Sequence, residues 1–70
     1  MQIRRRRNLP PVHIDRTAGD PVVYEGGHPC GMFWWDAVDG AYAIQYASGA
    51  RGIIRGIATE ADAIRTLLGR

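Results

Sequence analysis

The sequence has no lysine, a single cysteine and no apolar run near the roughly 20 residues that a membrane span requires. One cysteine, Cys30, excludes a disulfide within the chain, so we expect a cytoplasmic protein. We also expect no membrane binding, because the basic start of the chain carries no amphipathic apolar stripe. The arginine-rich start has no long apolar stretch behind it, which argues against a secretory signal. With 70 residues the chain is too short for a Rossmann unit or a barrel. It predicts one small domain with a thin core.

Positive charge is concentrated at the start of the chain. Residues 1–16 carry a formal charge of +4, whereas residues 17–70 carry −2. Four consecutive arginines, Arg4, Arg5, Arg6 and Arg7, dominate the first segment, and Pro10 and Pro11 favour an extended backbone after them. We predict a flexible basic arm over residues 1–11 and a single small α+β domain over residues 12–70.

The remaining pattern predicts an antiparallel sheet followed by one helix. Runs of β-prone residues at 32–38, 41–47 and 52–57 are separated by turns at Asp39-Gly40 and Ser48-Gly49. They predict a three-stranded antiparallel meander over about 32–57, and residues 12–25 can form an extra hairpin. Thr59 is a helix cap and Gly69 a natural stop, which predicts a helix over about 59–69. Ala61, Ile64 and Leu68 share one face of that helix.

Two-residue turns would place Trp35 opposite Ile44 and Tyr42 opposite Arg55. One sheet face then carries aromatic, aliphatic and arginine side chains: Phe33, Trp35, Tyr42, Ile44, Tyr46, Arg51, Ile53, Arg55 and Ile57. The other face is rich in alanine and glycine, and we expect the helix to dock there. In the alternative, the aromatic face is core, covered by the helix or by the 12–25 hairpin. In a third arrangement the hairpin covers part of this face and leaves four residues at its rim: Arg51, Arg55, Tyr42 and Tyr46.

Arginine interleaved with aromatic rings suits phosphates and bases. The predicted binding face therefore comprises Trp35, Tyr42, Tyr46, Arg51 and Arg55. Arg4, Arg5, Arg6 and Arg7 would add affinity by contacting the phosphate backbone, because guanidinium groups bind phosphate in a bidentate manner. The alternative for these four residues is a solvated tail that aids solubility.

The histidines and the cysteine do not form a recognisable site. His13, His28 and Cys30 match no zinc spacing, and a cysteine nucleophile would need a positioned base. We expect a buried thiol and exposed loop histidines. Asp36 and Asp39 lie on a strand face and in a turn, so they are no acid/base pair. We predict a protein that is not an enzyme and that needs neither metal nor cofactor.

The segment Arg4-Arg-Arg-Arg-Asn-Leu-Pro-Pro11, followed by a three-stranded sheet and a Thr59-capped helix, resembles the arm-type DNA-binding domain of phage tyrosine recombinases. That family is similar in fold to plant AP2 domains and inserts its sheet into the DNA major groove. The resemblance implies that Arg4–Arg7 form the basic arm and that Arg51, Arg55 and Trp35 lie on the groove-facing sheet. Residues 12–31 have no counterpart in the family, and the catalytic recombinase domain is absent.

These observations predict a small DNA-binding module encoded by a phage or another mobile element. The alternative is a protein-binding accessory or inhibitor of a host protein complex, such as an anti-defence or anti-CRISPR protein, that uses the aromatic face as its interface. The chain would act as a monomer, or as a homodimer joined through that face.

Overall fold

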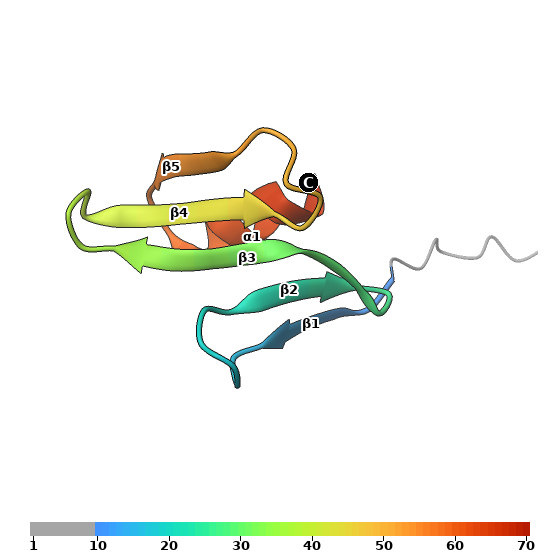
Figure 1. Cartoon of the computed structure of the whole chain (residues 1–70). Coiled ribbons are helices and arrows are strands. Elements are labelled where there is room, and N and C mark those ends of the chain that lie inside the picture. Colours follow the sequence, from blue (N-terminus) through green and yellow to red (C-terminus); the bar gives the residue numbers. More distant parts are fainter. Residues whose placement is uncertain (1–9) are drawn as a thin grey trace, which may run out of the picture.

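The computed structural model describes residues 10–70 as one antiparallel sheet with a helix packed against one face (Figure 1). The predicted α+β class is confirmed, and the five strands lie side by side in chain order. The elements are β1 (Val12–Asp15), β2 (Val22–Glu25), β3 (His28–Asp36), β4 (Ala41–Tyr46), β5 (Ile53–Ile57) and α1 (Glu60–Leu68).

The predicted hairpin over residues 12–25 forms as β1 and β2, but it extends the sheet instead of covering a face. Val22 pairs with Met32 and Val23 with Gly31, so β2 is hydrogen-bonded to β3. β3 begins at His28, earlier than the predicted start at Met32, because only a short turn at residues 26 and 27 separates it from β2. The sheet therefore has five strands instead of three.

Both predicted helix caps are confirmed. The hydroxyl of Thr59 accepts a hydrogen bond of 3.0 Å from the backbone N–H of Asp62, which satisfies one of the free donors of the first turn. At the other end, the N–H of Gly69 donates to the carbonyl groups of Arg65 and Thr66. These two caps fix where α1 begins and ends.

The side of α1 that packs against the sheet differs from the predicted one. Ala63 and Leu67 are buried, Ile64 and Leu68 are half-buried, and Ala61 is exposed. The contact stripe is therefore centred on Ala63 and Leu67, which lie on the helix beside the predicted stripe.

The core lies between α1 and the middle of the sheet, where Val23, Phe33 and Ile44 meet Ala63 and Leu67. Leu67 approaches β3 at Gly31. A Cβ atom added to Gly31 would lie 2.5 Å from Cδ2 of Leu67 and 2.4 Å from the carbonyl oxygen of Gln45. The bare backbone at this position is what lets the helix sit close to the sheet.

The loop between β3 and β4 has four residues, 37–40, and not the predicted two. Trp35 consequently pairs with Tyr42, and Phe33 pairs with Ile44. This shift of two residues leaves every β3 and β4 side chain on its predicted face, because side chains alternate with a period of two.

β5 departs further from the prediction. Ile54 pairs with Ile44, and an irregularity at Arg55 and Gly56 brings Ile57 opposite Tyr42. Gly56 has a φ of 78°, a left-handed conformation that glycine adopts easily at such a bulge. The slip of one residue moves Ile53 and Arg55 to the face that α1 does not cover, so their predicted place on the aromatic face is wrong.

Candidate nucleic-acid interface

The helix covers the aromatic face of the sheet, and the predicted docking on the alanine-rich face is wrong. Phe33 is 1% exposed and Ile44 is fully buried beneath α1. The physical reason is burial of apolar area: covering a phenylalanine and an isoleucine removes far more apolar surface from water than covering alanine and glycine. The alternative in which the aromatic face is core and lies under the helix is the one that the structure adopts.

The five predicted binding residues do not form one surface. Trp35 and Tyr42 lie near the start of α1, and Tyr46 and Arg51 lie near its end. Arg55 is on the opposite face of the sheet. The predicted arm residues Arg4, Arg5, Arg6 and Arg7 lie outside the described residues 10–70.

Trp35 and Tyr42 form an edge-to-face pair, with ring centroids 5.1 Å apart. Trp35 remains 53% exposed, whereas Tyr42 also packs against the buried ring of Phe33. Arg16 borders this cluster: its guanidinium lies 5.9 Å from the centroid of the Phe33 ring and forms a 2.7 Å ion pair with Glu60. The hydrogen bond to Glu60 raises the pKa of Arg16. Arg16 thus fastens the start of α1 to the sheet.

Arg55 is engaged by an acid of its own chain. Its Nη1 atom lies 2.9 Å from Oδ2 of Asp36, on the face opposite α1. A phosphate would have to displace Asp36 to pair with this guanidinium.

Tyr46 and Arg51 form a second aromatic–cation contact at the other end of the helix. The Tyr46 hydroxyl donates a 3.3 Å hydrogen bond to the carbonyl oxygen of Thr66, which fixes the ring against α1. The Arg51 guanidinium carbon lies 5.5 Å from the centroid of that ring. Arg51 is exposed, and it is the one arginine within residues 10–70 for which no ion pair forms inside that range.

Arg51 also has an uncommon backbone conformation. Among residues 10–70 it is the one non-glycine residue with a positive φ, at 69°. Residues other than glycine, asparagine and aspartate rarely adopt this backbone region, and holding such a residue there costs on the order of 1 kcal/mol. The loop over residues 47–52 therefore presents Arg51 in a conformation that most sequences avoid.

Charge is separated along the strand direction. The end of the sheet where β1, β3 and β5 finish holds Asp15, Asp20, Asp36, Asp39, Glu60 and Asp62 together with Arg16 and Arg55, for a formal charge of −4. We call this the acidic end. The opposite end holds Arg51, Arg65 and Arg70 together with Glu25, for a formal charge of +2. We call this the basic end.

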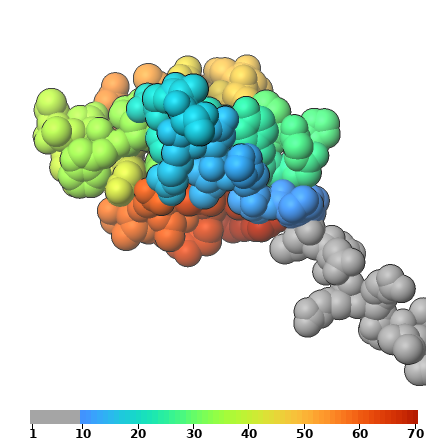
Figure 2. All heavy atoms as spheres, turned by 90° about the horizontal axis from the view of Figure 1, so that it is seen from below, coloured from blue at the N-terminus to red at the C-terminus, as the bar shows by residue number. Residues whose placement is uncertain are grey.

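The chain that leads to the arm joins the body at the basic end. Figure 2 shows residues 10–12, in blue, at the opposite end of the body from the 37–40 loop, in light green. The N–H of Gly26 donates a 2.9 Å hydrogen bond to the carbonyl oxygen of Pro11, which anchors this entry point beside the β2–β3 turn. Residues 10–12, which continue the chain from Arg4–Arg7, therefore lie at the end that carries the excess of arginine.

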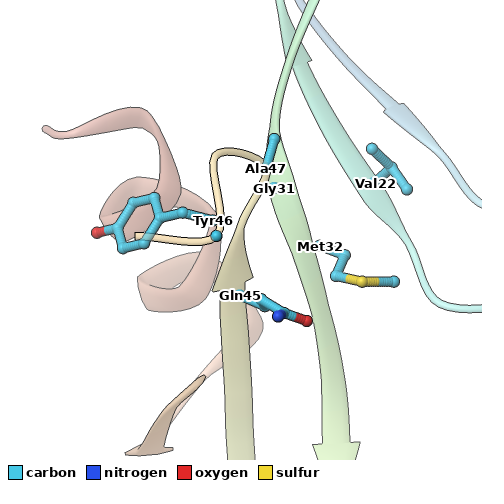
Figure 3. A pocket seen from close by; sticks show the side chains of 7 residues that line it. Val22, Gly31, Met32, Gln45, Tyr46 and Ala47 are labelled. Carbon is cyan, nitrogen blue, oxygen red and sulfur yellow. The ribbon is translucent and has the colours of Figure 1, made fainter. Parts of the chain in front are cut away.

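Two shallow hollows flank the 47–52 loop at the basic end. One, of about 340 Å³, lies beside Arg51 and is lined by Tyr46, Ser48, Ala50, Arg51, Thr66 and Gly69. The other, of about 250 Å³, lies on the opposite side of the sheet (Figure 3), where Met32 and Gln45 point away from Tyr46. The first volume is just above the lower limit of roughly 300 Å³ for small-molecule sites, and the second is below it.

The sheet face opposite α1 is largely apolar. Alternation along the paired strands places on it Val22, Tyr24, Met32, Trp34, Ala43 and Ile53. Ile53 is 45% exposed, and no helix packs on this face in the part of the chain that the structure describes. His13 and Gln45 also lie on this face, and at the acidic end it carries Asp15 and the Asp36–Arg55 ion pair.

The pKa of Asp15 is lowered from its ordinary value of 3.8, chiefly by a hydrogen bond from the Thr17 hydroxyl and then by one from the Thr17 N–H. These bonds are 2.6 and 2.9 Å long. The carboxylate thus accepts both donors and closes the turn after β1. Its negative charge contributes to the acidic end.

Cys30, His13 and His28 lie on strands. The thiol of Cys30 is half-buried and packs against the core, so the predicted burial is incomplete. Both histidines are exposed as predicted, but they belong to β1 and β3 and not to loops. Within residues 10–70 no three His, Cys, Asp or Glu side chains gather closely enough to hold a metal ion.

Comparison with known proteins finds no matching family model, no matching curated protein and no matching solved structure. The resemblance to the arm-type domain of phage tyrosine recombinases therefore stays a prediction. Across residues 10–70 no helix has the length and apolar character needed to cross a membrane.

Proposed function

We propose that this chain is a non-enzymatic nucleic-acid-binding module, of the kind that phages and mobile elements encode, and that it approaches its target with the basic end. The observation that carries the proposal is the separation of charge: Arg51, Arg65 and Arg70 lie at the end where the chain continues to Arg4–Arg7. A molecule with opposite charge at its two ends is oriented by the field of a polyanion before contact.

The proposed contact surface differs from the sheet face that the sequence predicts. Arg55 is paired with Asp36 and belongs to the acidic end, where a phosphate backbone would also meet Asp15, Asp20 and Asp39. The basic end has one acid, Glu25, which pairs with Arg70. Arg65 pairs with Asp62 one turn earlier on α1, so Arg51 is the arginine of residues 10–70 that keeps its charge without a carboxylate from that range. Contact there brings the arm and the body arginines to the same strand of nucleic acid.

The test is binding of labelled oligonucleotides, measured by fluorescence anisotropy at several salt concentrations. We expect binding at low salt that weakens steeply as salt is added, because each neutralised phosphate releases bound counterions. Replacing Arg4–Arg7 by glutamine should lower both the affinity and the slope of log K against log salt. The matched control replaces Arg16 and Arg55 by glutamine, which removes positive charge from the acidic end and should change the affinity less than twofold per residue.

Two results would overturn the proposal. One is the absence of binding to duplex and single-stranded DNA and RNA at low salt. The other is a loss from the Arg16 and Arg55 control as large, per charge, as the loss from the arm variant. The alternative function is binding of a host protein. It would be indicated by a protein partner that the wild type and the Arg4–Arg7 variant bind equally well in a pull-down. The aromatic face predicted for that role lies under α1, so such a partner would have to use another surface.

A further inference from the structure

We propose that the hollow beside Arg51 is a subsite for one unpaired nucleotide, so that the folded body prefers single-stranded over duplex nucleic acid. This inference rests on the proposed function and names the form of nucleic acid that the basic end would take. It is carried by Tyr46, Arg51 and the hollow between the 47–52 loop and the end of α1.

Tyr46 and Arg51 form a layered pair that an unpaired base can extend. The tyrosine ring is fixed by its hydrogen bond to Thr66, and the guanidinium lies over it at 5.5 Å. A guanidinium plane held on an aromatic ring can present its other side to a base, and arginine planes stack unpaired bases in RNA-binding proteins. Bases inside a duplex are already stacked and paired, so they cannot reach this surface without being extruded.

Arg51 also differs from the other arginines of residues 10–70 in having no carboxylate partner within that range. Arg16, Arg55, Arg65 and Arg70 each pair with a carboxylate, at Glu60, Asp36, Asp62 and Glu25 respectively. Arg51 contacts a neutral ring instead. A phosphate can therefore bind Arg51 without first displacing a carboxylate, which it would have to do at the other four arginines of the described chain.

The size and the lining of the hollow beside Arg51 suit a base. Its volume of about 340 Å³ is larger than a phosphate group needs and falls at the lower end of the range for small-molecule sites. Tyr46, Ser48 and Ala50 line it. The Ser48 hydroxyl accepts a hydrogen bond from the Ala50 N–H and keeps its own proton to donate. A base can use such a lining for packing and hydrogen bonding while its phosphate stays at the arginine. The left-handed backbone of Arg51 is a cost that this placement of the guanidinium explains.

The test compares two variants of the full chain that lose the same charge at the basic end. Arg51→Asn removes the guanidinium and keeps a residue that tolerates the left-handed conformation. Arg65→Gln removes a guanidinium that is paired with Asp62. Circular dichroism and urea unfolding establish that both variants fold. The probes are a labelled oligothymidylate of about ten nucleotides, within the usual site size, and a hairpin duplex with the same number of phosphates.

We expect Arg51→Asn to weaken binding of the oligothymidylate about tenfold and of the duplex less than about threefold, since one stacked base is lost only from the single strand. Arg65→Gln should weaken both by the same small factor. Thymidine 5′-monophosphate should also shift the NMR signals of the Tyr46 ring and the Gly69 amide in the wild type but not in Arg51→Asn.

Three outcomes would overturn the inference. The first is an equal effect of Arg51→Asn on the two probes. The second is an effect no larger than that of Arg65→Gln. The third is a selective loss of single-strand binding from Gln45→Ala, which would assign the base to the hollow on the opposite side of the sheet. Absence of any binding by the wild type would remove the proposed function and this inference together, whereas binding that ignores Arg51 removes this inference alone.

Discussion

The side chain of Asp36 on β3 reaches Arg55 on β5 across the intervening strand β4. The Nη1 and Oδ2 atoms are 2.9 Å apart, and the β4 residues beneath them, Ala41 and Ala43, carry only methyl groups. The second carboxylate oxygen of Asp36 accepts hydrogen bonds from the N–H groups of Val38 and Asp39, at 3.0 and 3.3 Å. One carboxylate therefore connects two strands and closes the loop between β3 and β4.

This arrangement predicts that Asp36 and Arg55 contribute unequally to stability. Asp36→Ala should lower the free energy of unfolding by about 1–2 kcal/mol, because it leaves two backbone donors without their acceptor. Arg55→Ala should cost less than about 1 kcal/mol, because its guanidinium is largely exposed to solvent. Urea unfolding of both single variants and the double variant measures the coupling. Equal losses from the two single variants would contradict this account.

Gly31→Ala should destabilise the protein by about 1–3 kcal/mol, as expected for overpacking against backbone and a core side chain. The new Cβ would meet the Gln45 carbonyl and Leu67 at 2.4 and 2.5 Å, so α1 or β4 must shift. Gly40→Asn is the control, since a Cβ at that position meets nothing within 4 Å and asparagine tolerates the left-handed backbone. Thermal or urea unfolding compares the two, and an unchanged midpoint for Gly31→Ala would show that the helix does not need this close approach.

Thr59→Ala should cost about 1 kcal/mol of stability, the usual value for losing a side-chain N-cap. The hydroxyl of Thr59 is the acceptor for the Asp62 N–H at 3.0 Å. Thr59→Ser retains that acceptor and should leave the unfolding midpoint nearly unchanged. If serine and alanine at this position were equally destabilising, the cap would not be the cause.

The stability of the protein at low pH should depend on Asp15. Its pKa is lowered from 3.8 in the folded chain, mainly by the Thr17 hydroxyl, so its contribution is fully present above that value. The contribution is lost as the pH falls below 3.8 and through the lowered pKa of the folded state. Thr17→Val removes the larger of the two hydrogen bonds and should raise the pKa of Asp15 towards 3.8, as followed by NMR of its carboxyl carbon. An unchanged titration midpoint in Thr17→Val would contradict the assigned cause.

Local signals in the sequence were sufficient for the ends of the helix and for most strand positions. Thr59 and Gly69 act through atoms within a few residues of themselves, so their roles follow from residue type and spacing. The β4 alternation and the turn residues around Gly40 likewise predicted two adjacent strands, and both form. The length of the turn was not predictable in the same way, because the Asp36 carboxylate organises a four-residue loop in place of the two-residue one.

The choice of face depended on information that no local pattern carries. β3 is apolar on both sides, with Phe33 on one face and Trp34 on the other, so alternation alone did not decide which side α1 would cover. Gly31 was the available signal: a glycine in phase with Phe33 marks a close approach of another element. The β4–β5 loop over residues 47–52 is longer than the predicted two-residue turn, so β5 is shifted by one residue and Arg55 lies on the face away from Arg51. The bulge at Gly56 then returns Ile57 to the face that α1 covers.

The order of the strands has a consequence for how the chain folds. Each strand pairs only with its neighbours in sequence, so the whole sheet can form by successive hairpins with short loops to close. Proteins dominated by such local contacts have low contact order and reach the native state quickly. The contacts between residues farthest apart in the sequence join α1 to β2 and to the end of β1. They include the ion pairs Arg70–Glu25 and Arg16–Glu60. The first hairpin and the helix are therefore expected to join last, and arrival of α1 at Val23 and Phe33 is the step that excludes water from the core.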